Sequence, residues 1–127
     1  MSKIKSVKRP DAVSIIKEEH RISFSFRMLH PISYTDTDAR FFVKFFERLK
    51  KLSEFTWKQI DVSARHSFGY EKIPVSKIRP KVNLTSEIKE LHVFRATGDN
   101  HSFLGFRIGD VFNVVFIEAN FGDIYKH

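Results

Sequence analysis

The sequence has no cysteine, and its 127 residues include only one tryptophan, four prolines and five glycines. The lack of cysteine excludes disulfide bonds, thiolate zinc sites and cysteine nucleophiles. The longest apolar runs, such as Val114–Ile117, are far too short to span a bilayer. The opening MSKIKSVKRPD carries charge but no apolar segment, unlike a secretory signal. We therefore expect a cytoplasmic protein with no membrane partner.

Several enzyme signatures are missing as well. The sequence contains no glycine-rich phosphate loop, no serine nucleophile elbow and no paired-carboxylate signature. Its six histidines show no spacing typical of metal ligands, such as H-x-x-x-H on one helix. We expect neither a metal site nor a cofactor.

Phenylalanine and positive charge are abundant instead. Fourteen phenylalanines can form the core of one compact domain, since each buries about 150–250 Å². The 22 lysines and arginines exceed the 15 aspartates and glutamates, which gives a formal net charge of +7. Such a charge attracts phosphates, acidic proteins and anionic membranes alike, so it does not select the partner.

The N-terminal part predicts an arm followed by a strand. Residues 1–20 are expected to form a basic arm that can end in a short helix, and residues 21–127 a single domain. Apolar and polar residues alternate over Arg21–Met28, as is typical of a half-buried strand. This period of two places four apolar side chains on one face, namely Ile22, Phe24, Phe26 and Met28.

Two helices are predicted next. Thr35–Asp38 offers side-chain oxygens that can cap a helix start. An amphipathic helix of about four turns follows from apolar residues at helical spacing. These residues are Phe42, Phe45, Phe46, Leu49 and Leu52. Ser53 can cap a second helix to about Arg65, whose inward residues are Trp57, Ile60 and Ala64. The short connection predicts an antiparallel helical hairpin.

The remainder predicts a basic loop and three strands. Lys72–Val82 contains two prolines and four cations, which suits an extended loop. Leu91–Arg95, Phe103–Ile108 and Val111–Ile117 are rich in β-branched and aromatic residues, and Gly109-Asp110 is a hairpin signal. We expect an α+β domain of order β-α-α-β-β-β, with the helical hairpin packed on an antiparallel sheet.

Three C-terminal stretches resemble the RelE/ParE-like toxin superfamily. They are "VFRA" (Val93–Ala96), "GFRIGDVFNVVFI" (Gly105–Ile117) and "DIY" (Asp123–Tyr125). Members of the superfamily place an arginine in one strand, another in the next, and a tyrosine or histidine after the last strand. The resemblance implies a bacterial toxin of a toxin–antitoxin system that cleaves mRNA at the ribosome without a metal. It also implies an acidic antitoxin protein as partner.

The end of the chain is also similar to small bacterial proteins that finish in an Asp-Pro-x-His-x-x-Tyr pattern. Glu118, Ala119 and Phe121 stand near the positions of that Asp, Pro and His. The missing histidine removes an obvious proton-transfer group, which favours a binding function over catalysis.

The catalytic residues expected on this basis are Arg107, Arg95, Tyr125 and His66. Attack by the RNA 2′-hydroxyl needs a proton acceptor, cations at the phosphate and a donor to the leaving oxygen. The planar arginine fork suits two phosphate oxygens. Tyr125 could stack on a base or donate a proton, and His66 could be the general base.

Each of these residues also has a purely structural interpretation. Arg107 could pair with Glu118 on the same face, and Tyr125 could close the core edge. His66 could simply be a cation at the end of the second helix. His127 is expected to be frayed.

The relation between the two arginines depends on strand register. If residue 95 pairs with residue 102, Arg95 and Arg107 point to opposite faces, whereas a slip or a bulge brings them together.

A cationic stripe comprises Lys72, Lys77, Arg79 and Lys81. It could follow the phosphates of a nucleic acid, or it could be a solvated loop.

Two other functions stay open. The first is a non-catalytic nucleic-acid- or protein-binding module, including an inhibitor of gyrase as in the ParE branch. The second is a protein-interaction domain whose charge serves solubility alone.

Overall fold

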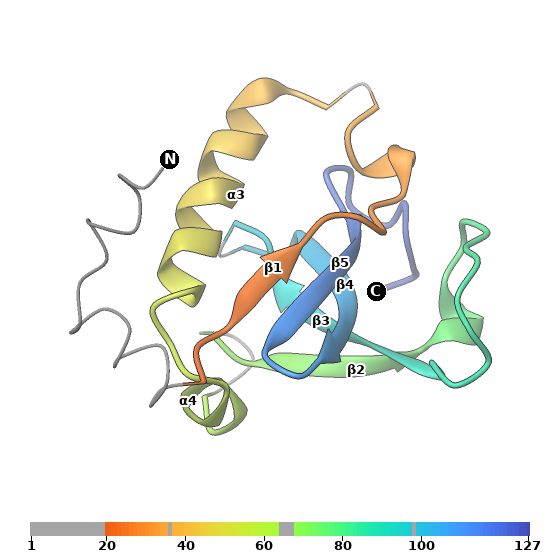
Figure 1. The fold of residues 1–127 in the computed structure, drawn as a ribbon. Coiled ribbons are helices and arrows are strands. Elements are labelled where there is room, and N and C mark those ends of the chain that lie inside the picture. The colour runs from red at the N-terminus through yellow and green to blue at the C-terminus, as the bar shows by residue number, and fades with distance from the viewer. Residues whose placement is uncertain (1–19, 36, 64–67, 98) are drawn as a thin grey trace, which may run out of the picture.

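The computed structural model describes residues 20–35, 37–63, 68–97 and 99–127. Five strands form one sheet in the order β1-β5-β4-β3-β2, and the long helix α3 lies on one side of it (Figure 1). The strands are β1 Ser23–Ser25, β2 Tyr70–Pro74, β3 Glu90–Arg95, β4 Ser102–Ile108 and β5 Val111–Ile117. The helices are α3 Ala39–Leu52 and α4 Trp57–Asp61, with short 3-10 turns η1 Pro31–Ser33 and η2 Val75–Lys77. The protein is a mixed α+β structure.

The predicted basic arm and short helix over residues 1–19 lie outside the described residues. Among the helices that are described, none has the length and apolar composition needed to cross a membrane.

The first strand is shorter than its alternating pattern predicts. β1 pairs in parallel with β5, with Phe24 opposite Phe112, and the chain turns soon afterwards at residues 27–28. Ile22 and Phe24 therefore pack under α3, while Met28 packs in the apolar cluster on the other side of the sheet. Phe26 remains 39 % exposed. The expectation of one shared apolar face is wrong beyond Phe24, because the period of two holds only while the backbone stays extended.

Helix α3 begins where its capping residue predicts. The Asp38 side chain accepts a hydrogen bond from the backbone N–H of Arg40 at 2.9 Å. The buried side chains are Phe45, Leu49 and Leu52. Phe46 is 62 % exposed, contrary to prediction. Phe41 packs against the core in its place, since residues four apart share a helix face and adjacent residues do not.

The second helix is a single short turn. α4 has five residues and starts after Thr56, so the prediction of Ser53 as its cap is wrong. Thr56 and Gln59 form a capping box, in which each side chain accepts the other residue's backbone N–H. Trp57 and Ile60 are buried, as predicted, and Ala64, the third residue predicted to face inward, lies outside the described residues. α4 is too short to form the second arm of a helical hairpin.

The segment predicted as a basic loop begins as a strand. Tyr70–Pro74 forms the edge strand β2 and pairs antiparallel with β3. Pro74, read as a loop signal, stands at the end of an edge strand, where a missing N–H is tolerated. The described order is therefore β-α-α-β-β-β-β. The sheet is mixed rather than wholly antiparallel, because β1 runs parallel to β5.

The predicted β4–β5 hairpin is confirmed, and it contains a bulge. Gly105 lies opposite Val114, but Leu104 lies opposite Phe116, so β5 carries one extra residue. Val115 and Phe116 consequently join the same apolar cluster, although they are adjacent in sequence. One apolar cluster lies under α3, and the second lies on the other side of the sheet beneath Ile124 and Tyr125.

Candidate functional site

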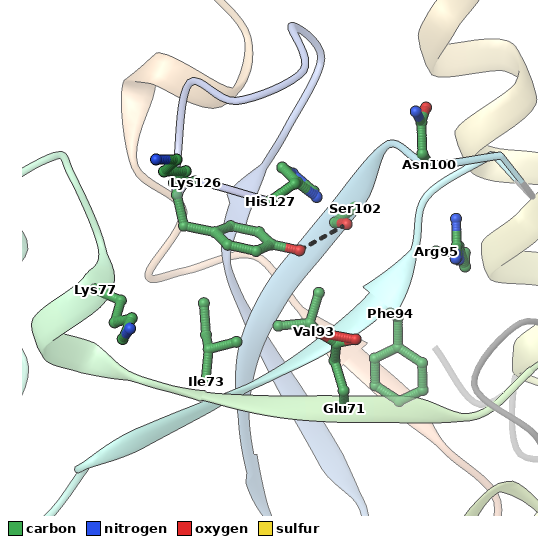
Figure 2. Close-up of a pocket in the computed structure, with 11 residues that line it drawn as sticks. Glu71, Ile73, Lys77, Val93, Phe94, Arg95, Asn100, Ser102, Lys126 and His127 are labelled. Carbon is green, nitrogen blue, oxygen red and sulfur yellow. Dashed lines mark hydrogen bonds between the residues drawn. The ribbon is translucent and has the colours of Figure 1, made fainter.

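A hollow of about 300 Å³ opens on the side of the sheet that carries the second apolar cluster (Figure 2). Ile73, Val93 and Phe94 form part of its wall. Its polar lining consists of Glu71, Lys77, Arg95, Asn100, Ser102, Tyr125, Lys126 and His127. We call it the C-terminal hollow, because three of these residues follow β5.

The charge of the C-terminal hollow is predominantly positive. Lys77 comes from η2, Arg95 ends β3, and Lys126 follows β5, so three separate elements contribute a cation. Glu71 of β2 is the carboxylate that lines the same space. The guanidinium of Arg95 donates a hydrogen bond to the carbonyl oxygen of Asp99 at 2.5 Å. An anion with several oxygens fits this set of groups best.

His127 is held by a buried carboxylate. Its Nε2 lies 2.7 and 2.8 Å from the two carboxylate oxygens of Glu118, which is 0 % exposed and also accepts the backbone N–H of Gly122 at 2.9 Å. The His127 ring stacks on Phe121 at 3.9 Å between centroids. The prediction that His127 is frayed is therefore wrong for this structure, because hydrogen bonds and ring stacking both hold it.

The environment of Glu118 makes it a strong partner for an imidazole. Burial raises the pKa of Glu118, and the hydrogen bonds from His127 and Gly122 oppose that rise. A hydrogen bond from His127 to the Glu118 carboxylate uses the tautomer that carries its proton on Nε2. In that tautomer Nδ1 keeps its lone pair, and it forms no hydrogen bond with any described residue. The pair thus resembles the carboxylate–histidine arrangement that supports proton transfer.

Tyr125 lines the C-terminal hollow. The residue is only 7 % exposed and belongs to the second apolar cluster, and its hydroxyl lies 3.4 Å from that of Ser102. Burial raises the pKa of Tyr125, although Ser102 opposes this, so the phenol is neutral at physiological pH. The Tyr125 ring therefore closes the edge of the core, which is the structural role expected as the alternative to catalysis. A base could not stack on a ring that the protein already covers.

Arg107 lies on the other side of the sheet from Arg95. Arg95 pairs with Ser102, so it shares a face with Leu104, whereas Arg107 points to the face of Phe103 and Gly105. The bulge lies between β4 and β5 and leaves the β3–β4 register unbroken, so it does not bring the arginines together. The predicted two-arginine site is absent from the described residues.

Arg107 does not pair with Glu118 either. Its guanidinium carbon lies 4.2 Å from the centre of the Trp57 ring, and its Nε donates to the carbonyl oxygen of Gly109 at 2.7 Å. The side chain lines a second hollow of about 470 Å³, together with Lys72, His92 and seven other residues. We call this the hairpin hollow, because it adjoins the end of the β4–β5 hairpin.

The predicted cationic stripe is divided. Lys77 of η2 lines the C-terminal hollow, together with Glu71 and Ile73 of β2, whereas Lys72 lines the hairpin hollow, because successive residues of β2 point to opposite faces. Arg79 and Lys81 are exposed and line neither hollow. His66, the predicted general base, lies outside the described residues.

Sequence reasoning missed the most complete group of the site. Lys126 and the Glu118–His127 pair were not expected there. The available signal was a carboxylate placed directly after the apolar strand Val111–Ile117, where an unpaired charge is costly to bury. No spacing rule connects that carboxylate to a histidine nine residues later.

Comparison with protein-family models, characterised proteins and solved structures finds no significant match to the chain. Within the described ranges, no three His, Asp or Glu side chains gather in an arrangement that could hold a metal ion.

Proposed function

We propose that the C-terminal hollow binds the phosphate backbone of RNA and that the protein is a RelE-like toxin, a metal-independent endoribonuclease that acts on mRNA. One observation carries the proposal: Lys77, Arg95 and Lys126 line the same hollow as His127. The buried carboxylate of Glu118 holds that histidine. Three cations can balance the charge that develops on a phosphate, and the histidine can move the proton. An acidic antitoxin segment is the proposed protein partner, because it complements the same positive hollow.

In the proposed reaction, the 2′-oxygen of a ribose attacks the adjacent phosphorus. Nδ1 of His127 accepts the 2′-hydroxyl proton, and Glu118 stabilises the imidazolium that forms. The bond between phosphorus and the 5′-oxygen breaks, and that oxygen takes a proton from water. The products are a 2′,3′-cyclic phosphate and a 5′-hydroxyl. Arg95 would stabilise the phosphorane-like charge through its planar fork.

A second candidate is a binding module without turnover, including a ParE-type inhibitor. The observation that favours it is the burial of Tyr125 together with the separation of Arg95 from Arg107. Such a module would bind nucleic acid or an acidic protein with strong salt dependence and would leave RNA intact.

Incubation of the full chain with single-stranded mRNA in the presence of EDTA, with and without ribosomes, tests the proposal. We expect cleavage products that end in a 2′,3′-cyclic phosphate. His127→Gln should slow cleavage about 10²–10⁴-fold through the loss of the proton acceptor. Arg95→Gln should slow it about 10²-fold through the loss of phosphate stabilisation.

The matched control is Lys44→Gln, which removes an exposed positive charge on α3 from a residue that does not line the hollow. It should retain the wild-type rate. If the RNA stays intact both with and without ribosomes while the protein binds it tightly and in a salt-sensitive way, the result would contradict the proposed nuclease activity and support the binding module. Equal rates for His127→Gln and Lys44→Gln would exclude the proposed role of His127.

A further inference from the structure

The guanidinium of Arg107 is held in a fixed orientation. It stacks over the Trp57 ring at 4.2 Å, and its Nε donates to the Gly109 carbonyl oxygen at 2.7 Å. Trp57 is itself 2 % exposed, and its indole N–H donates to the carbonyl oxygen of Asp110 at 2.9 Å. The platform beneath the arginine is therefore rigid, and little side-chain entropy is left to lose when Arg107 binds a ligand.

The two terminal nitrogens of Arg107 are available to a ligand. They form no hydrogen bond or ion pair with any residue that the structure describes. The residue is exposed, and it lines the hairpin hollow. A fixed fork of two parallel N–H donors that faces a hollow is the geometry that binds two oxygens of one phosphate.

The rest of the hairpin hollow sets the size and charge of the ligand. Lys72, Lys89 and Arg107 supply three cations, and Glu87 and Glu90 supply two carboxylates, so the lining has a small positive balance. That balance suits one phosphate group better than a cluster of phosphates. The volume of about 470 Å³ exceeds the needs of a lone phosphate and leaves space for the group attached to it.

His92 forms part of the wall of the hairpin hollow. Its Nδ1 is buried and has no hydrogen-bond partner among the described residues, although such atoms are nearly always satisfied in folded proteins. Burial, followed by the charge of Lys72, lowers the pKa of His92. The ring therefore lies at the hollow as a neutral imidazole.

We infer that the hairpin hollow is a second phosphate-binding site, in which Arg107 grips one phosphate group of a nucleotide and Lys72 contacts its remaining oxygens. The phosphate can belong to a free nucleotide or to a strand of RNA. The edge strand β2 separates the two hollows, since Glu71 and Ile73 line one and Lys72 the other. A strand of RNA that crosses this edge would occupy both hollows, and this extension rests on the proposed function.

Trp57 provides the readout, because it is the one tryptophan of the chain and contacts Arg107 directly. The full-length protein is titrated at constant ionic strength with inorganic phosphate, adenosine monophosphate and a 2′-O-methylated RNA oligonucleotide that cannot be cleaved. We expect a saturable change of Trp57 fluorescence with each probe. Tighter binding of the mononucleotide than of the oligonucleotide identifies a free nucleotide as the ligand, and the reverse order identifies RNA.

Three variants distinguish bidentate binding by the Arg107 guanidinium from non-specific attraction by positive charge. Arg107→Gln should abolish the response, and Arg107→Lys should weaken binding about 10-fold, because the charge remains while the bidentate contact is lost. Lys44→Gln, which removes an exposed charge outside both hollows, should bind as the wild type does. Isothermal titration calorimetry of the same variants keeps the test valid if Arg107→Gln alters the emission of Trp57.

A wild-type protein that shows no saturable phosphate binding, or an Arg107→Gln variant that binds as Lys44→Gln does, would overturn the inference. The phosphate and mononucleotide titrations involve no RNA cleavage. A protein that leaves RNA intact but binds phosphate through Arg107 would therefore refute the proposed nuclease and keep the second site.

Discussion

At the scale of single residues, Asp99 organises the turn that follows Arg95. Its Oδ1 accepts hydrogen bonds from the Thr97 hydroxyl at 2.8 Å and from the backbone N–H of His101 at 2.8 Å. It also lies 2.9 Å from Nδ1 of the His101 ring. Burial alone would raise the pKa of Asp99, but these bonds outweigh it and lower the pKa to about 2. The turn that carries Arg95 to the C-terminal hollow thus depends on an ionised carboxylate.

We predict that Asp99→Asn lowers the free energy of unfolding at pH 7 by about 1 kcal/mol, after allowance for solvent screening. The allowance is needed because the side chain is 58 % exposed. The folded pKa is depressed, so the stabilisation is present above the unfolded value of 3.8 and is lost as the pH falls towards 2. Urea unfolding at several pH values measures this.

The difference between wild type and Asp99→Asn should narrow between pH 4 and pH 2. Asp123→Asn is the control, because this exposed carboxylate accepts no hydrogen bond from any described residue, and it should change stability by less than about 0.5 kcal/mol. A difference for Asp99→Asn that stays constant with pH would contradict the proposed role of its charge.

At the scale of elements, Gly105 allows β4 and β5 to pair at the bulge. A Cβ at this position would collide with the backbone carbonyl oxygen of Asn113. That oxygen belongs to the neighbouring strand, so no side-chain rotation can relieve the contact. The requirement for glycine here comes from a close approach of two backbones, not from backbone dihedral angles.

Gly105→Ala is expected to destabilise the protein by about 3 kcal/mol or more, because the two strands must move apart. Gly109→Ala is the comparison: Gly109 has φ of +62°, and an added Cβ meets no atom within 4 Å. Its cost should be limited to the left-handed backbone, about 1–2 kcal/mol. Chemical denaturation of both variants measures the difference, and equal costs would show that the strands separate easily at the bulge.

At the scale of the whole molecule, phenylalanine rings connect the helix to the sheet. Phe103 of β4 is 0 % exposed and lies 5.2 Å from Phe45 of α3 and 5.3 Å from Phe94 of β3, between ring centroids. It also contacts Phe112 of β5 and Phe24 of β1 at 5.8 and 6.1 Å. One side chain thus joins four other elements.

Phe103→Ala should therefore lower the free energy of unfolding by about 3–5 kcal/mol, through lost burial and the cavity that remains. Phe46→Ala removes the same ring from an exposed position of α3 and should cost less than about 0.5 kcal/mol. Thermal and urea unfolding distinguish the two. A Phe103→Ala variant as stable as Phe46→Ala would mean that the core refills the cavity.

Local patterns were sufficient for much of the fold. Asp38, one of the four residues of the predicted capping stretch Thr35–Asp38, caps α3, and the β4–β5 hairpin turns at Gly109-Asp110, because capping and tight turns depend on neighbouring residues. The edge strand β2 was missed, since its pairing with β3 depends on residues some twenty positions away. Phe46 was misplaced because the exact helical face is selected by the sheet beneath α3.

The candidate site depended far more on the tertiary structure. The net charge of +7 predicts attraction to phosphates, acidic proteins and anionic membranes alike and selects none of them, because charge is a property of composition. The face on which Arg95 or Arg107 lies depends on strand register, and a shift by one residue reverses it. The Glu118–His127 contact forms only when the chain folds back beside β5. Long-range packing therefore assigned the two arginines to separate hollows and supplied the histidine that local patterns could not place.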